Sequence, residues 1–372
     1  MQKRNLWLII GALVVIAVII IGIRLARKPT PREQVIKIGA ILPLTGPASS
    51  FGQYVKEGID LSVEEINKKN TPFKFHIIYE DSKNQPKEAV AAYNKMLAIE
   101  KPYVVIAALS SVASALAPLA PKNKTVLLFV DVAKPGVADG IFSFRLYPEA
   151  SGTAGVISRF AALYLRAKRA GVIYINDDYG LASLKVFTKK FQSLGGKVIF
   201  TESYMLTQKD FKDIMIKLKN INPPPDVVYL NGYGPAFVKA VRQYREIGVQ
   251  ATLVADVAMG LPENLSQAGN AAEGVYFVDA EISPSFINLF RQRYGKDPSS
   301  DAAYAYDAIR ILYKIRKEIP EWKPDYIRKA LKKIKNFPGV TGPITFKPSG
   351  DAQLHFIVKK VINGKPVKVE WR

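Results

Sequence analysis

Short apolar runs alternate with longer amphipathic segments along most of the chain. The apolar runs are rich in valine, isoleucine and phenylalanine, as strands are, and they occur at 35–42, 75–79, 103–108, 126–130, 171–175, 197–200, 226–230 and 252–255. Between them, apolar residues recur at helical spacing, as at Val55, Ile59, Val63 and Ile66. The alternation predicts βαβ units with mostly parallel sheets, which is an α/β fold.

The series of strands and helices is interrupted once and then starts again. The stretch from Arg145 to Gly155 separates two similar βα series. A chain of 372 residues with 48% hydrophobic content is long enough to bury two cores of ordinary domain size. We therefore expect two lobes, joined at about residue 149.

The amino-terminal residues carry a different pattern. Leu6 to Ile23 is an uncharged run of 18 residues with basic residues on both sides, just long enough to span a bilayer. A cleaved signal peptide is the alternative, but the length of the run and the lack of a small-residue cleavage pair favour an uncleaved anchor. No cysteine follows to accept a lipid. We expect residues 1–28 to form a transmembrane anchor with its flanks, and residues 29–34 a tether.

Composition excludes several kinds of chemistry. The chain has no cysteine and only two histidines, His76 and His355, which excludes a cysteine nucleophile or a thiolate metal site and nearly excludes a multi-histidine site. The motifs G-x-G-x-x-G, G-x-x-x-x-G-K-[ST], G-x-S-x-G and H-E-x-x-H are absent. We therefore expect neither a cofactor nor an enzymatic activity.

The formal net charge of +21 makes nucleic acid a partner to consider. The lysines and arginines fall mostly on predicted helix surfaces, however, and no nucleic-acid-binding motif accompanies them. We interpret them as solvated helix faces near an anionic membrane. No nucleic-acid partner is expected.

The loops that follow the predicted strands carry residues suited to a small zwitterion. In parallel sheets, ligands collect beyond the carboxyl ends of the strands, where helices begin. Ser110 and Ser111 would receive a carboxylate at a helix start. Asp256 would receive an ammonium group with help from the hydroxyl of Tyr233. Two further aromatic side chains would form an apolar wall, and these are Phe51 and Tyr179.

Each of these residues also has an ordinary structural interpretation. Ser110 or Ser111 alone is equally well explained as a helix cap, and Asp256 alone as a cap or turn residue. Tyr179 and Tyr233 alone are common loop aromatics. The convergence of five strand-end loops is what indicates a site.

Several sequence blocks resemble one known family. The block from Ile36 to Gly52 closely resembles the opening of the leucine/isoleucine/valine-binding family of periplasmic proteins. Further blocks follow in the family's order, namely Asp81 with Pro86, Ala89 and Val90, then Asp177-Asp178-Tyr179-Gly180, Asn231-Gly232-Tyr233-Gly234-Pro235, Ala272-Glu273-Gly274-Val275-Tyr276, and Thr341-Gly342-Pro343 with Gly350. The resemblance covers residues 35 to about 360.

The resemblance implies a two-lobed type I periplasmic-binding-protein fold that closes around its ligand by a hinge. It implies three crossovers, with lobe I at 35–148 and 278–343 and lobe II at 149–277 and 344–372. The protein would capture an amino-acid-like ligand and deliver it to the permease subunits of an ABC transporter. The body would lie on the extracytoplasmic side of the cell membrane, although the basic residues around the apolar run do not by themselves favour that orientation.

The resemblance also assigns roles to single residues. Phe51 corresponds to the first-lobe aromatic, Ser111 to the carboxylate-binding hydroxyl with Ser110 beside it, and Tyr179 to the lid aromatic of the second lobe. The other two assignments are Tyr233 as a second polar aromatic and Asp256 as the acidic partner of the ligand's amine.

One loop departs from the family pattern. The family usually has small or hydroxyl residues after the fourth strand, whereas this chain reads Asp131-Val132-Ala133-Lys134-Pro135. Lys134 either supplies a charge to the ligand, binds a more acidic ligand or points to solvent, and the usual exposure of lysine favours solvent. Two alternatives therefore stay open: a membrane-tethered sensor with the same fold, and binding of an amide or other small organic solute.

Overall fold

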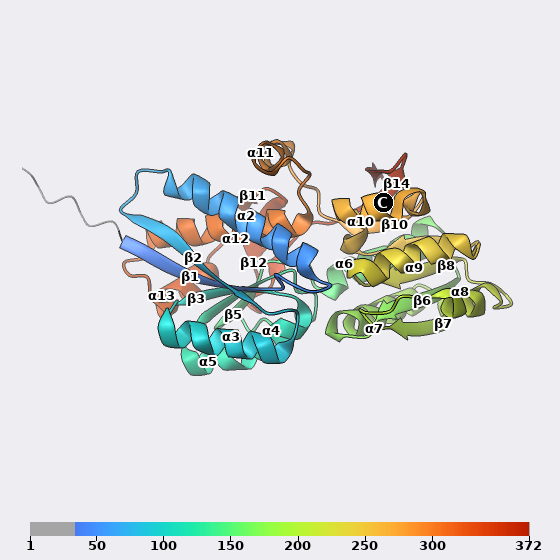
Figure 1. Cartoon of the computed structure of the whole chain (residues 1–372), viewed down its shortest axis with the longest axis horizontal. Coiled ribbons are helices and arrows are strands. Elements are labelled where there is room, and N and C mark those ends of the chain that lie inside the picture. The colour runs from blue at the N-terminus through green and yellow to red at the C-terminus, as the bar shows by residue number, and fades with distance from the viewer. Residues whose placement is uncertain (1–33, 372) are drawn as a thin grey trace, which may run out of the picture.

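The computed structural model describes residues 34–371. It has two lobes, which lie side by side along the long axis of the molecule (Figure 1). The expected anchor at 1–28 lies outside the described residues, and so does the expected tether apart from Gln34. Within 34–371, no helix combines the length and the apolar character needed to cross a membrane.

Lobe I is built on a five-stranded parallel sheet with the strand order β2-β1-β3-β4-β5. The strands are β1 (Gln34–Leu42), β2 (Phe73–Asp81), β3 (Val104–Ala108), β4 (Val126–Val130) and β5 (Ser143–Arg145). Every residue of β3 and β4 is buried. The reason is that helices cover both faces of the sheet, so these strands have no solvent side.

The helices of lobe I come from two distant parts of the chain. One face of the sheet is covered by α2 (Ser49–Asn67), α12 (Ser300–Glu318) and α13 (Pro324–Leu331). The other face is covered by α3 (Pro86–Ile99), α4 (Ser110–Leu116) and α5 (Ala120–Asn123). A further helix, α11 (Pro284–Tyr294), packs on α2, where Phe290 stacks on Tyr54 with ring centroids 6.2 Å apart. The first lobe is therefore complete only when residues beyond 300 have joined it.

Gly58 allows α2 and α12 to approach closely. A Cβ atom at this position would lie 2.1 Å from the backbone oxygen of Ala302. We expect Gly58→Ala to destabilise the protein by about 1–3 kcal/mol through overpacking, although alanine favours helices. Thermal unfolding should show a lower midpoint than in the wild type.

The matched control is Gly155→Ala within α6 (Ala150–Arg159). There the added methyl would meet only Cγ1 of Val186, at 3.8 Å, so alanine should stabilise by about 0.5–1 kcal/mol. Equal midpoint shifts for the two variants would contradict close packing at Gly58.

Lobe II is built on a seven-stranded sheet with the order β15-β14-β10-β9-β8-β6-β7. Five strands are parallel, and these are β6 (Arg169–Ile175), β7 (Lys197–Tyr204), β8 (Val227–Asn231), β9 (Thr252–Ala255) and β10 (Tyr276–Asp279). Two antiparallel strands from the end of the chain, β14 (Ile357–Ile362) and β15 (Lys365–Val369), extend the sheet beyond β10. The chain thus ends in the second lobe, as the resemblance implies.

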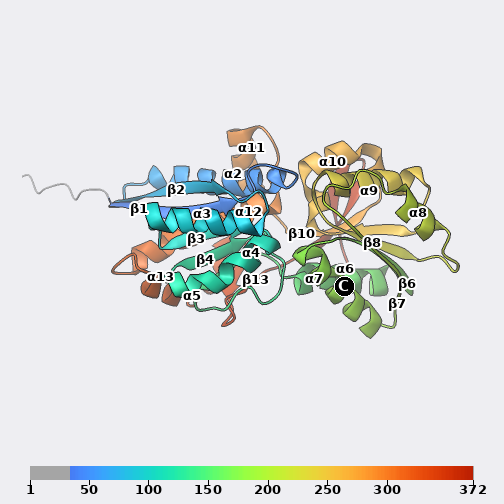
Figure 2. The same cartoon turned by 60° about the horizontal axis from the view of Figure 1, so that its bottom comes forward.

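Helices also cover both faces of the lobe II sheet (Figure 2). On one face lie α6 and α7 (Asp178–Ser193). On the other lie α8 (Lys212–Lys219), α9 (Gly234–Glu246) and α10 (Pro262–Ala268). The two layers of helices bury the central parallel strands, such as β8, whereas the edge strand β7 is largely accessible.

The chain passes between the lobes three times. It crosses after β5, after β10 and after β13 (Ala352–Gln353). Strand β13 belongs to a small antiparallel sheet with β11 (Phe337–Gly339) and β12 (Gly342–Phe346). The expected lobe boundaries at 277/278 and 343/344 fall within β10 and β12, respectively.

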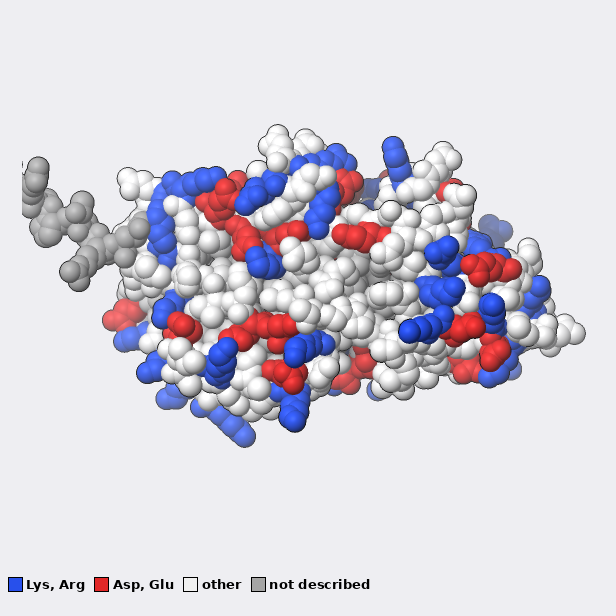
Figure 3. Space-filling model, viewed as in Figure 1, with Lys and Arg blue, Asp and Glu red and all other residues white. Residues whose placement is uncertain are grey.

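Charged side chains are dispersed over the surface. On the face shown in Figure 3, lysines and arginines lie on both lobes and alternate with aspartates and glutamates. They do not gather into one basic stripe on this face. Many form exposed ion pairs, as Lys95 does with Glu80 at 2.7 Å and Lys217 with Glu202 at 3.0 Å.

Candidate functional site

A narrow cavity lies between the two lobes. Lobe I contributes Phe51, Leu109, Ser110, Asp131, Ala133 and Tyr147 to its wall. Lobe II contributes Asp177, Tyr179, Gly232, Tyr233, Val257 and Ala258. The wall thus consists of residues that follow β1, β3, β4, β5, β6, β8 and β9, because the carboxyl ends of parallel strands meet at one edge of each sheet.

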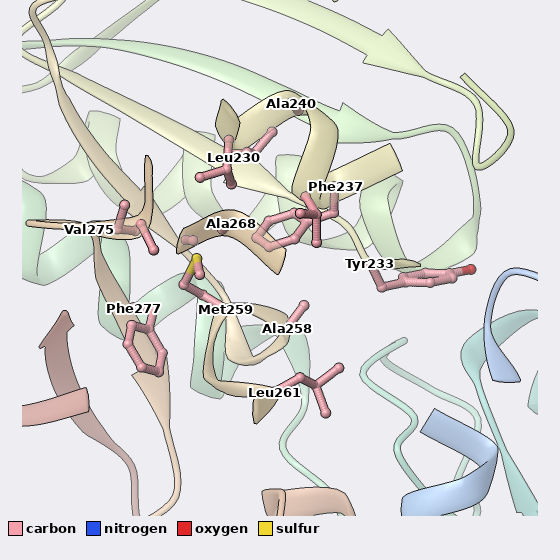
Figure 4. Close-up of a cluster of buried hydrophobic side chains, with 14 of the residues drawn as sticks. Leu230, Tyr233, Phe237, Ala240, Ala258, Met259, Leu261, Ala268, Val275 and Phe277 are labelled. Atoms are coloured by element: carbon pink, nitrogen blue, oxygen red, sulfur yellow. The ribbon is translucent and has the colours of Figure 1, made fainter. Parts of the chain in front are cut away.

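Phe51 and Tyr233 form the contact that closes the cavity on its apolar side. Phe51 belongs to α2 and Tyr233 immediately precedes α9, and both are buried. Their rings meet edge to face with centroids 5.6 Å apart. Figure 4 shows Tyr233 at the end of the lobe II core, with its hydroxyl directed away from Phe237 and the other core side chains.

The hydroxyl of Tyr233 is held by polar groups from both lobes. It donates a hydrogen bond to Oδ2 of Asp177 at 2.5 Å and accepts one from Nδ2 of Asn84 at 2.9 Å. The predicted help of this hydroxyl to Asp256 in receiving an amine stays a prediction, and in this structure the hydroxyl bonds Asp177 instead. The cause is the placement of Asp177, which caps α7 through the backbone N–H of Gly180 at 2.9 Å and faces the cavity.

Asp256 is buried directly behind Tyr179. Its Oδ2 atom accepts hydrogen bonds from the hydroxyl of Tyr179 at 2.9 Å, from Nδ2 of Asn231 at 2.7 Å and from the hydroxyl of Tyr229. Its Oδ1 atom is buried without a hydrogen-bond partner among the described residues. Burial raises the pKa of Asp256, and the three hydrogen bonds offset only part of that effect.

Tyr179 is therefore more than an apolar wall. Its ring lies 6.1 Å from that of Tyr233, centroid to centroid, and its hydroxyl is committed to Asp256. Among the described residues, Tyr179 separates the carboxyl group of Asp256 from the cavity, whose wall includes Tyr179 but not Asp256.

The two predicted serines are placed differently. Ser110 begins α4, is buried and lines the cavity. Its Oγ atom accepts a hydrogen bond from the backbone N–H of Lys134 at 3.2 Å. Ser111 is half-buried and does not line the cavity. Ser114, one turn further along, bonds the carboxyl group of Asp178 at 2.7 Å.

Lys134 is paired with another side chain, so the expectation that it points to solvent is wrong. Its Nζ atom lies 2.9 Å from Oδ2 of Asp178 and 3.0 Å from Oγ of Ser114. Burial would raise the pKa of Asp178, but hydrogen bonds from Lys134 and Ser114 outweigh burial and lower it. The three residues form a polar contact between the lobes beside the cavity, because α7 of lobe II begins opposite α4 of lobe I.

Two acidic wall residues were not among the predicted site residues. Asp131 and Asp177 both line the cavity, and both belong to loops that follow strands. Burial raises the pKa of Asp177, while the hydrogen bond from Tyr233 opposes this. Their position at strand ends was the available sequence signal, but it is shared with many turn residues. No cluster of three or more metal-ligating acids, histidines or cysteines occurs within 34–371.

The geometry agrees with what comparison with known proteins reveals. A family model described as periplasmic binding protein matches residues 35–361. The chain belongs to the periplasmic binding protein family. The match spans both lobes of this binding protein and all the residues that wall its cavity.

Relatives of this binding protein are similar over nearly the whole folded body. The Leu/Ile/Val-binding protein BraC3 of Rhizobium johnstonii is 26% identical, over 90% of this chain and 94% of its own length. The leucine-, isoleucine-, valine-, threonine- and alanine-binding protein of Pseudomonas aeruginosa is 26% identical, over 85% and 87%. The resemblance to the leucine/isoleucine/valine-binding family is thereby confirmed.

Solved structures confirm the fold of this binding protein. The leucine-binding protein LivK of Thermotoga maritima has a TM-score of 0.84 and 27% identity, covering 90% of this chain and 98% of its own. LivJ of Streptococcus pneumoniae, solved in complex with isoleucine, has a TM-score of 0.82 and 25% identity, covering 90% and 100%. The predicted two-lobed type I fold with mostly parallel sheets is confirmed.

Proposed function

We propose that this protein captures an amino-acid-like solute between its lobes, outside the cytoplasm, and delivers it to the permease subunits of an ABC importer. The observation that carries the proposal is the buried cavity with Phe51 and Ser110 on one wall and Tyr179 and Tyr233 on the other. A solute in this cavity touches both lobes, so it favours the closed arrangement over an open one. Relatives named for binding leucine, isoleucine and valine support an amino-acid-like ligand.

In this proposal each end of the solute has its own partner. Ser110, which lines the cavity at the start of α4, receives the carboxylate, with Ser111 beside it in the same turn. Asp256 pairs with the amine through Oδ1, the carboxylate oxygen that has no partner among the described residues, once Tyr179 shifts and opens the way from the cavity, whose wall does not include Asp256. The aromatic rings of Phe51, Tyr179 and Tyr233 enclose the remainder, and Lys134 stabilises the closed arrangement through Asp178.

The site supports capture and release rather than turnover. A binding protein needs two lobes that separate and close, and the polar contacts between the lobes are hydrogen bonds and an ion pair that water can replace.

We further propose that the uncharged run from Leu6 to Ile23 anchors the protein in the cell membrane and that residues 29–34 act as its tether. The amino-terminal sequence of native protein would begin beyond Ile23 if the run were cleaved.

Ligand binding should raise the thermal stability of the protein. A solute present at 100 times its dissociation constant stabilises the folded form by about 2.7 kcal/mol, because it binds the folded state alone. The measurement is the thermal unfolding midpoint in the presence of a panel of amino acids and amides.

Carboxylates without an amine, such as acetate and isovalerate, serve as matched controls and should give little shift. A panel in which no compound raises the midpoint would contradict the proposed function. Consumption of a bound solute would indicate an enzyme instead.

A further inference from the structure

The wall of the cavity is acidic and contains no basic side chain. Asp131 contributes a carboxyl group from lobe I and Asp177 contributes one from lobe II, while no lysine, arginine or histidine of the described residues lines the cavity. The nearest cation described above, Lys134, is paired with Asp178 outside the wall. Two acids thus line a space whose wall holds no basic side chain, and a third acid, Asp256, is hydrogen-bonded to the wall residue Tyr179.

Asp131 is the least satisfied of these acids. It is 7% exposed, and its Oδ2 atom is buried without a hydrogen-bond partner among residues 34–371. By contrast, Asp177 receives hydrogen bonds from Tyr233 and Gly180. An acceptor that is buried and unpaired costs about 1–3 kcal/mol, and more if it is charged, so the arrangement favours a partner that supplies N–H groups.

The backbone holds Asp131 at the cavity. Its φ angle is +52°, in the left-handed region, and its backbone oxygen accepts a hydrogen bond from the N–H of Leu109 at 3.0 Å. Aspartate and asparagine adopt this conformation at lower cost than most residues. The side chain therefore comes from a fixed backbone position rather than from a free loop.

A second buried acid next to Asp131 makes a positively charged partner there more favourable. Asp301, at the start of α12, is fully buried beside it. Burial, and then the charge of Asp301, raise the pKa of Asp131 well above its ordinary value, while the hydroxyl of Tyr147 opposes this weakly. A positively charged group placed against Asp131 would relieve both burial and repulsion.

A protonated Asp131 that donates to a ligand carboxylate is the competing interpretation. The charge of the wall favours a cation instead, because the wall holds Asp131 and Asp177 and no basic side chain, and further unpaired acceptors lie behind it. Oδ1 of Asp256 and Oδ1 of Asn84, whose amide group bonds Tyr233, are both buried without partners among the described residues. A site with several unpaired acceptors is complementary to a solute with several N–H groups.

We propose that the solute of this site carries two positively charged nitrogens, one for Asp256 and a second one that pairs with Asp131. The inference rests on the proposed function, since it names the class of amino-acid-like solute that the same cavity takes. That class comprises amino acids with a short basic side chain, in which the second nitrogen adds a charge to the ordinary zwitterion.

Matched pairs of amino acids test the inference on the wild-type protein. L-ornithine and L-norvaline differ by the terminal ammonium group, and so do L-lysine and L-norleucine. Calorimetric titration of the purified full-length protein should give a dissociation constant at least about 10-fold lower for one basic member than for its neutral partner. Neutral members that bind as tightly as the basic ones, or more tightly, would overturn the inference while leaving the proposed function intact.

The variant Asp131→Asn identifies the residue responsible. Asparagine retains the shape and tolerates the left-handed backbone, and unchanged circular dichroism would confirm the fold. The basic amino acid should bind about 30-fold to several thousand-fold more weakly, whereas its neutral partner should change by less than about threefold. An unchanged preference in this variant, or tighter binding of the neutral member alone, would overturn the assignment to Asp131.

Asp226→Asn is the control for a general effect of charge. Asp226 lies at the opposite, amino-terminal end of the lobe II strands, where it accepts hydrogen bonds from Lys168 and Arg169. Its replacement should leave the preference for the basic amino acid unchanged, and a loss as large as that in Asp131→Asn would overturn the local pairing. If none of the four amino acids binds the wild type, the inference fails, and the proposed function fails with it only if no compound of the wider panel of amino acids and amides binds either.

Discussion

Replacement of Asp256 by asparagine should weaken binding of the best amine-bearing ligand by about 30-fold to several thousand-fold, because the amine loses the charge of its partner in a buried site. Asparagine keeps an oxygen that can accept from Tyr179, Tyr229 and Asn231, so the local structure should persist. Calorimetric titration measures the affinity. A carboxylate without an amine should be nearly indifferent to the change.

The alanine variant at this position requires a separate interpretation. Asp256→Ala removes the acceptor for three buried donors as well as the charge, so it should also lower the stability of lobe II by a few kcal/mol, on the order of 1–3 for unsatisfied donors. Affinity losses in Asp256→Ala therefore combine two effects. Wild-type affinity in Asp256→Asn would show that Asp256 is a structural residue and would remove the amine assignment.

Replacement of Arg145 by methionine should destabilise the protein by about 3 kcal/mol, at the lower end of the range for a broken buried ion pair. Arg145 is completely buried at the end of β5. Its guanidinium group contacts Asp351 at 2.5 Å, Glu149 at 2.9 Å and the backbone oxygen of Lys134 at 2.6 Å. Methionine fills the volume but leaves these oxygens without a cation. Urea unfolding followed by circular dichroism provides the free energy.

Arg291→Met is the matched control for Arg145→Met. Arg291 pairs with Asp297 on the surface, where both side chains are about half exposed, and exposed pairs contribute about 0–1 kcal/mol. Equal losses of stability in the two variants would mean that the contacts of Arg145 with the interlobe connection contribute no more than a surface pair.

The main elements of both sheets could be predicted because strong local patterns encode them. All eight predicted strands are present, and β4, with the sequence VLLFV, is buried throughout as a central parallel strand should be. Four strands of the two large sheets were not predicted, namely β5, β10, β14 and β15. β5 has only three residues, and β15 is largely exposed with two lysines, so neither shows the apolar run that marks a buried strand.

The positions of the site residues could be predicted, but their partners could not. Because the site residues follow strand ends, they were predicted to lie near one another. The structure brings together Phe51, Ser110, Tyr179, Tyr233 and Asp256. Whether Lys134 meets Asp178 or solvent depends on how α7 sits against α4, which no local pattern encodes. For the same reason the sequence could not show that the hydroxyl of Tyr179 bonds Asp256 and that of Tyr233 bonds Asp177.

The late arrival of α12 and α13 has a consequence for biosynthesis. The sheet of lobe I is complete at Arg145, but two of the three helices that cover one of its faces, α12 and α13, follow only from Ser300 onward. At roughly 5–20 residues per second, about 8 to 30 s of translation separate these two points. During that time α2 is the only one of the three helices available to cover an apolar face that includes Ile36, Ile38 and Ile106. The nascent protein thus exposes apolar surface to chaperones well before it can bind a solute. A chain whose translation stops before α12 is expected to aggregate.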